Sequence, residues 1–274
     1  MREKVNGFVG VMAVAILCMV SGLCMVWGIA PVVLAVYVAA CAVCGRYMIT
    51  CIGCAAGVAA GSMGIAGLLH AYEYMIPGPA YSGVMVTEKY LVLLGLAMCL
   101  MKIVYSRNSR SYVRVIVVMS AAVLMGNIVV YADNMLMAAA YGVVEAAIFM
   151  CASVILKPGI GLLYTYICGD ASDVERDESW NISQGIVSLM ALAAVVLWVV
   201  PGEDIYGVNP AFMLALVLIL YAVYRTGAVY GCGMAAVAGS IVSVKLNDSR
   251  WLMWMLLVTL VMLIGRALTG RRKV

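Results

Sequence analysis

Residues 135–156 read MLMAAAYGVVEAAIFMCASVIL, an apolar run with a single charged residue, Glu145. An α-helix rises about 1.5 Å per residue, so about 20 apolar residues are enough to cross the hydrocarbon core of a bilayer. The segment therefore predicts a transmembrane helix. Runs of similar character recur along the chain, separated by short stretches that carry charges, prolines or glycines.

The composition of the whole chain agrees with this interpretation. Hydrophobic residues make up 66% of the sequence, charged residues only 11%, and the mean hydropathy is +1.09. Soluble domains carry about 25% charged residues, and a fold this apolar could not cover its own surface with polar groups. At about 20 residues per span, the 274 residues allow roughly ten spans. We therefore expect no room for a globular enzyme domain within them.

The apolar runs predict an all-α fold, a polytopic transmembrane helix bundle of about ten spans that forms a single domain, 1–274. The first run is expected to stay as a span, because it lacks a clear signal-peptide cleavage site. A cytoplasmic loop is expected at 157–181, with Pro158 at its edge, where the missing backbone donor costs least. The expected spans are 7–27, 30–44, 47–70, 87–105, 112–131, 135–156, 182–200, 211–224, 226–244 and 250–268.

The distribution of positive charge predicts the orientation. Lys and Arg favour cytoplasmic loops. If the N-terminus is cytoplasmic, only Lys89, Lys245 and Arg250 of the 17 basic residues fall outside, which leaves 14 (17 − 3) inside. This asymmetry favours an even number of spans with both termini in the cytoplasm.

Small residues recur at spacings of four in two of the expected spans, which places them on one helix face and lets two backbones approach closely. This pattern predicts helix-packing faces. Two interpretations remain open: static packing within one bundle, or a moving or self-associating interface. The glycines are Gly53, Gly57 and Gly61 in the third span, and Gly227, Gly231 and Gly239 in the ninth.

Two pairs of cysteines, Cys41 and Cys44, then Cys51 and Cys54, have the spacing of a four-thiolate zinc site. Cysteine is frequent throughout this chain, and the pairs lie in apolar runs, where cysteine acts as a small hydrophobic residue. We therefore treat the pairs as a weak metal candidate and expect no metal and no cofactor.

Glu145 is the one acidic residue deep inside an expected span. Burial of a carboxylate in a bilayer costs at least a few kcal/mol, so Glu145 should be neutral, paired or beside a wet cavity. The residue is either a proton or substrate site or a protonated group bonded to a neighbouring helix. His70 lies three residues before Glu73, within reach of a pair at the external end of the third span.

The sequence contains no phosphate-binding loop, nucleophile elbow or zinc-protease motif, so we expect no enzyme activity and no nucleic-acid partner.

The last third of the chain carries a family resemblance. WNISQGIVSLMALAAVVLW (180–198) and DIYGVNPAFMLALVLILYAVYRTGAVYGCGMAAVAGSI (204–241) resemble the membrane region of stage II sporulation protein E. The matching pattern is a polar segment before a helix start, a short turn, a helix rich in Leu and Tyr, and a glycine-rich helix. The residues that carry it are Ile186, Ser188, Leu189, Tyr221, Gly227, Ala228, Gly231, Ala235 and Gly239.

This resemblance implies a ten-span region that anchors a cytoplasmic metal-dependent serine/threonine phosphatase in the bacterial cell membrane. It further implies self-association, placement at the polar septum, and contact with the tubulin-like division protein. The phosphatase itself is expected to lie outside these residues. The first functional hypothesis is therefore a multi-pass anchor for localisation and oligomerisation. The alternative is a small-solute permease, or the membrane subunit of a transporter, that uses Glu145.

Overall fold

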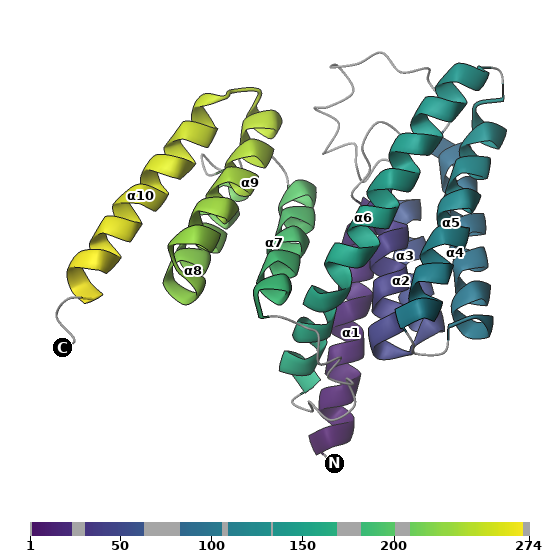
Figure 1. The fold of residues 1–274 in the computed structure, drawn as a ribbon, viewed down its shortest axis with the longest axis horizontal. Coiled ribbons are helices and arrows are strands. Elements are labelled where there is room, and N and C mark those ends of the chain that lie inside the picture. Colours follow the sequence, from purple (N-terminus) through teal and green to yellow (C-terminus); the bar gives the residue numbers. More distant parts are fainter. Residues whose placement is uncertain are drawn as a thin grey trace. The chain divides into compact units, whose positions relative to one another are not determined.

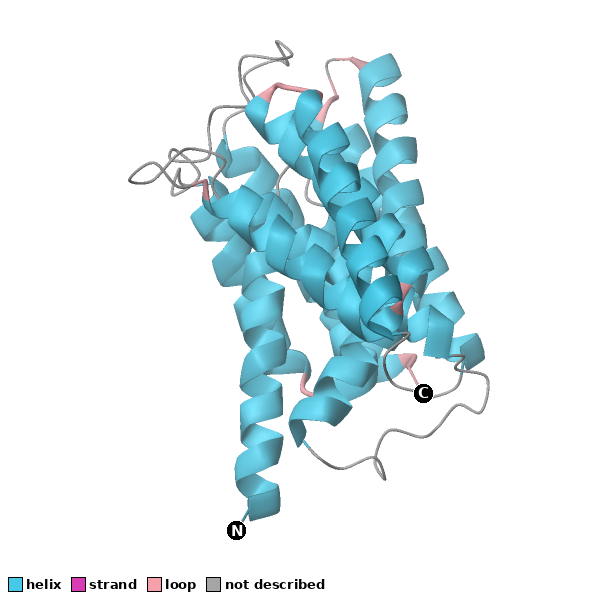
Figure 2. Cartoon of the chain, turned by 90° about the vertical axis from the view of Figure 1, so that its left-hand side faces the viewer, coloured by secondary structure: helices cyan, strands magenta, loops and turns pink. Residues whose placement is uncertain are grey.

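The computed structural model describes residues 2–23, 31–62, 83–105, 109–132, 134–168, 182–200 and 209–270. The expected pair of His70 and Glu73, the acidic residues 170–178 and the basic residues 271–273 lie outside these ranges. Every regular element in the described part of the chain is an α-helix (Figure 2). The helices are α1 (Arg2–Leu23), α2 (Pro31–Cys44), α3 (Tyr47–Ser62), α4 (Gly83–Ile103), α5 (Ser109–Val130), α6 (Met135–Cys168), α7 (Ile182–Val199), α8 (Pro210–Thr226), α9 (Ala228–Leu246) and α10 (Arg250–Gly270).

Four of the described helical stretches are long and apolar enough to cross a membrane, judged by length and composition: 110–130, 135–167, 228–246 and 250–267. Five further apolar stretches are shorter, at 8–23, 32–44, 47–61, 184–199 and 210–226. The chain is thus an all-helical protein with the apolar helices of a membrane protein.

The chain divides into two compact units, Met1–Leu189 and Met190–Val274. In the first unit, α2 is the central helix, packed against α1, α3, α4 and α6. Its residues 33–41 are all fully buried, and a helix that is apolar on every side is stable only when it is surrounded. In the second unit, α9 packs against both α8 and α10 (Figure 1).

Helix α6 differs from the expected span of 135–156 and from the expected loop of 157–181. It continues through Pro158 as far as Cys168. Proline interrupts the helical hydrogen bonds, but neighbouring Ser or Thr side chains can pair the backbone groups that are freed. Here the backbone N–H of Gly159 donates to Ser188 Oγ on α7, at 2.6 Å. Pro158 therefore lies inside a helix and not at its edge.

The second unit uses local signals at its helix ends. Asn209 is the N-cap of α8, and its side chain accepts a hydrogen bond of 2.9 Å from the Phe212 backbone N–H. Gly227 separates α8 from α9 with φ of 101°, a backbone conformation that glycine adopts without a steric penalty. Asn247 ends α9 in the left-handed conformation. These turns return the chain so that α8, α9 and α10 pack side by side.

Candidate functional site

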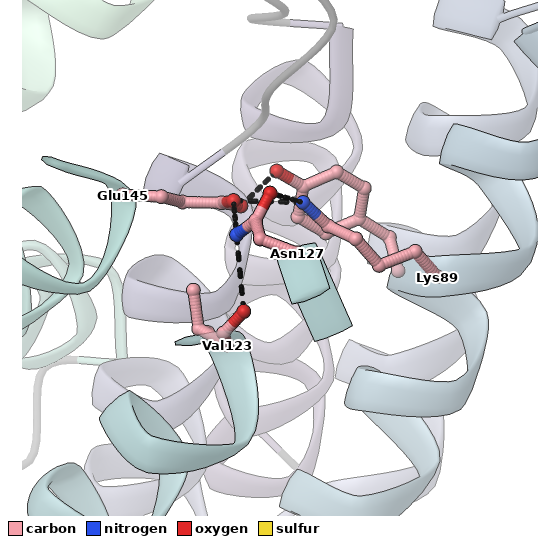
Figure 3. A network of polar contacts seen from close by, with 5 residues as sticks. Lys89, Val123, Asn127 and Glu145 are labelled. Carbon is pink, nitrogen blue, oxygen red and sulfur yellow. Dashed lines mark hydrogen bonds and ion pairs between the residues drawn. The ribbon is translucent and has the colours of Figure 1, made fainter. Parts of the chain in front are cut away.

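Glu145 is fully buried and lies at the centre of a polar network formed by three helices of the first unit (Figure 3). Lys89 Nζ donates to Glu145 Oε2 at 2.7 Å, from α4 to α6. Asn127 on α5 donates to the same carboxylate oxygen through Nδ2 at 2.6 Å. Tyr90, the neighbour of Lys89, donates its hydroxyl to Oε1. Both oxygens of the carboxylate are therefore paired with donors from other helices.

Asn127 also orders the other members of the network. Its Oδ1 accepts a hydrogen bond of 3.1 Å from Lys89 Nζ. Its Nδ2 additionally donates to the Val123 backbone carbonyl, 3.0 Å away and one turn earlier on α5. Because the carbonyl side of the amide meets a cation and the NH₂ side meets an anion and a carbonyl, only one orientation of this amide satisfies every partner.

Burial sets the electrostatics of the network. Asn127, Tyr90 and Glu145 are fully buried, and the side chain of Lys89 is 4% exposed. Unpaired charges in such a place are strongly unfavourable, whereas a hydrogen-bonded pair of opposite charges has no net charge. Each polar side-chain atom of the four residues has a hydrogen-bond partner within the network.

The network lies nearer to one end of the unit than to the other. Lys89 is six residues from the start of α4, about 9 Å along the axis, and Asn127 is three residues from the end of α5, about 4.5 Å. Glu145 is ten residues into α6, about 15 Å. Tyr131, just after the end of α5, stacks on Tyr141 of α6, with the ring centroids 5.2 Å apart.

Sequence reasoning identified Glu145 but not its partners. The charge count places Lys89 on the external side. The structure begins α4 at Gly83 and not at the expected 87, and it buries Lys89 almost two turns inside this helix. Tyr90 and Asn127 were not singled out. The available signal was one lysine at the start of an apolar run and one asparagine within another. Their pairing could not be predicted from sequence, because the partners are distant along the chain. Lys89 is 56 residues from Glu145 and 38 residues from Asn127.

The glycines of the third span lie against α1. A Cβ on Gly53 would be 2.6 Å from the Ala15 carbonyl oxygen, and one on Gly57 would be 2.1 Å from that of Met19. Gly61 is buried on the same helix. At these positions the α3 backbone touches the α1 backbone, so this face is occupied within the chain.

The glycines of the ninth span have separate roles. A Cβ on Gly231 would be 2.5 Å from a methyl of Val223 on α8, and one on Gly239 would be 2.9 Å from a methyl of Leu252 on α10. Gly227 lies between α8 and α9, where an added Cβ would be 3.9 Å from Nη1 of Arg266. The first two are packing positions. Gly227 instead makes the turn.

The four candidate cysteines do not come together as metal ligands. Cys41 Sγ lies 3.3 Å from the Thr50 hydroxyl, and Cys54 Sγ contacts the Val33 carbonyl at 3.9 Å. Cys44 and Cys51 are partly buried. Among the described residues, no group of three or more His, Cys, Asp or Glu side chains is placed to hold a metal ion.

Comparison of the chain with protein-family models, with curated proteins and with solved structures finds no match in any of the three.

Proposed function

We propose that this chain is a multi-pass membrane anchor whose ten helices cross the bilayer with both ends in the cytoplasm. The observation that carries the proposal is the large number of exposed apolar side chains on helices of both units. Soluble proteins rarely leave extensive apolar surface uncovered, whereas lipid covers it at no cost. Examples are Ile16, Ile52, Val92, Val117, Val144, Val217, Val237 and Leu257, one each from α1, α3, α4, α5, α6, α8, α9 and α10.

The basic residues of the first unit support the orientation. Exposed Arg46 lies at the turn from α2 to α3, and exposed Lys102, Arg110 and Arg114 flank the connection from α4 to α5. Both connections lie at one end of the unit, because the Tyr105 hydroxyl donates to the Ala42 carbonyl at the end of α2. Positive charge collected at one end favours the cytoplasmic side for that end.

The resemblance to stage II sporulation protein E supports the biological role. By that resemblance, the chain would place a cytoplasmic phosphatase module at the septal membrane of a bacterial cell, near the tubulin-like division protein. Self-association would have to use faces other than those of Gly57 and Gly231, because helices of the same chain already occupy these two positions.

Localisation and topology test the anchor proposal directly. A fluorescent protein joined after Val274 should stay in the membrane fraction after alkaline carbonate extraction. In a sporulating host it should concentrate at the polar septum. Reporter fusions near Gly45 and after Ala132 should report opposite sides of the membrane. Release by carbonate, or the same side for both fusions, would exclude this topology, and uniform membrane fluorescence would remove the septal role.

The second candidate function is a small-solute permease or a transporter subunit. One observation favours it: a lysine and a glutamate are paired inside an apolar helix bundle, and ionisable residues in such places commonly serve transport. Glu145→Gln alone leaves Lys89 buried without its counter-charge, so a loss of transport could reflect a loss of folding. The test therefore uses Lys89→Met together with Glu145→Gln. Full transport by this folded double variant would refute a role of the ion pair.

A further inference from the structure

The groups that surround Lys89 Nζ form a binding site for an ammonium group. The nitrogen meets a carboxylate oxygen of Glu145 at 2.7 Å and the amide oxygen of Asn127 at 3.1 Å. It also lies over the ring of Tyr90, 4.7 Å from the centroid. A counter-charge, a neutral oxygen acceptor and an aromatic face are the three elements by which proteins recognise ammonium ions. Figure 3 shows the Lys89 side chain reaching toward Asn127 and Glu145.

Three hydrogen bonds hold the site together without involving the lysine. Asn127 Nδ2 bonds the Glu145 carboxylate at 2.6 Å and the Val123 carbonyl at 3.0 Å. The Tyr90 hydroxyl bonds the other oxygen of Glu145. These three hydrogen bonds fix the carboxylate, the amide and the phenol relative to one another, and none of them involves Lys89. Removal of the ammonium would therefore leave its acceptors in place.

Lys89 is the member best suited to leave the site. Its ammonium is attached through a flexible four-carbon stem, whereas Asn127 and Glu145 are held through short side chains and mutual bonds. Lys89 is also the least buried of the four. Counted over the whole residue, its exposed fraction is 8%, whereas the other three residues are at 0%.

We propose that Tyr90, Asn127 and Glu145 form a binding site for a primary alkylammonium ion, which Lys89 occupies as a tethered ligand. An external primary amine in its protonated form binds there when the lysine side chain is removed or displaced. The proposal concerns binding alone. It holds whether the chain serves only as an anchor or also moves a solute.

Chemical rescue tests the proposal. Lys89→Ala removes Cγ, Cδ, Cε and Nζ, and propylammonium has the same three carbons and nitrogen. The purified variant in lipid nanodiscs should unfold at a lower temperature than the wild-type chain. Propylammonium chloride should restore at least half of that loss in a saturable manner, and propanol should not. Wild type should need at least a tenfold higher concentration for any response, because Lys89 competes.

Three controls separate the site from a general effect of the amine. Lys89→Met fills the space of the stem, so it should not respond. Lys89→Ala combined with Glu145→Gln lacks the counter-charge and should not respond either. Lys245→Ala removes another buried lysine, whose Nζ donates to the Val200 carbonyl in the second unit, and it should not respond.

Each outcome of these measurements either supports or overturns the ammonium site. A saturable rescue of Lys89→Ala that is absent from all three controls supports the site. Equal stabilisation of Lys89→Ala and of the double variant, or no stabilisation at all, overturns it. If Lys89→Ala is recovered only from cultures that contain propylammonium, and not from cultures with propanol, that result also supports the site. Recovery from neither medium overturns it.

Discussion

The contact between α1 and α3 predicts that Gly57→Ala destabilises the protein. A Cβ at Gly57 would be 2.1 Å from the Met19 carbonyl oxygen and 2.9 Å from its carbonyl carbon. Ordinary contacts begin near 3.4 Å, so the two helices must separate by about 1.3 Å (3.4 − 2.1) at this level. The neighbour is backbone and cannot rotate away, so the helices themselves have to move.

The magnitude follows from two opposing effects. Overpacking of a well-packed interior costs about 1–3 kcal/mol, and a contact with backbone belongs in the upper part of that range, at about 2–3 kcal/mol. Alanine in place of glycine in a helix contributes up to about 1 kcal/mol in the other direction. The net expectation for Gly57→Ala is a loss of about 1–2 kcal/mol in the free energy of unfolding.

Gly95→Ala on α4 is the matched control. It has the same change in helix propensity, but no atom of the described residues lies within 4 Å of the added Cβ. The difference in unfolding free energy between the two variants therefore isolates the overpacking, about 2–3 kcal/mol. The assay is unfolding in mixed detergent micelles, followed by circular dichroism. If Gly57→Ala is as stable as Gly95→Ala, the close contact of α1 with α3 is refuted.

Three further changes probe the other contacts. Ser188→Ala removes the acceptor of the Gly159 N–H and should cost about 1–3 kcal/mol, with faster hydrogen exchange of that amide; unchanged exchange would contradict the pairing. Asn209→Ala removes the N-cap of α8 and should lower stability by about 1 kcal/mol, whereas Asn209→Asp should keep most of it. Lys89→Met and Glu145→Gln should each cost about 3–5 kcal/mol alone and clearly less than the sum together, and additive losses would show that the two residues are not paired.

Much of the helical pattern could be predicted from sequence, because many of the helices are apolar runs bounded by charged residues, proline or glycine. The seventh helix was expected at 182–200 and is found at Ile182–Val199, and the tenth was expected at 250–268 and is found at Arg250–Gly270. The main difference concerns α6, which continues through Pro158. Sequence rules treat proline as a stop, and they do not include the hydroxyl of Ser188, supplied by another helix, that pairs the Gly159 amide.

The site was less predictable than the helices. Glu145 stood out because a charge in an apolar run is conspicuous by itself. Lys89 did not, because a lysine near a span end is usually assigned to the interface. What places it inside is its rotational position on α4, which faces Asn127 and Glu145. That rotation depends on contacts between helices that are distant in sequence, and no local pattern reports it.

The physics of lipid explains why these two kinds of contact matter. Lipid tails are as apolar as leucine, so hydrophobicity does not determine which face of a helix turns toward its neighbours. Close approach of backbones and pairing of polar groups determine that face instead. Helices α1 and α3 use the first, through Gly22, Gly53 and Gly57. Helices α4, α5 and α6 are joined by polar pairing, since rotation of any one of them would separate hydrogen-bonded groups of Lys89, Asn127 and Glu145. The ion pair therefore fixes helix rotation whether or not it also binds a cation, and a transport assay needs variants in which both charges are removed together.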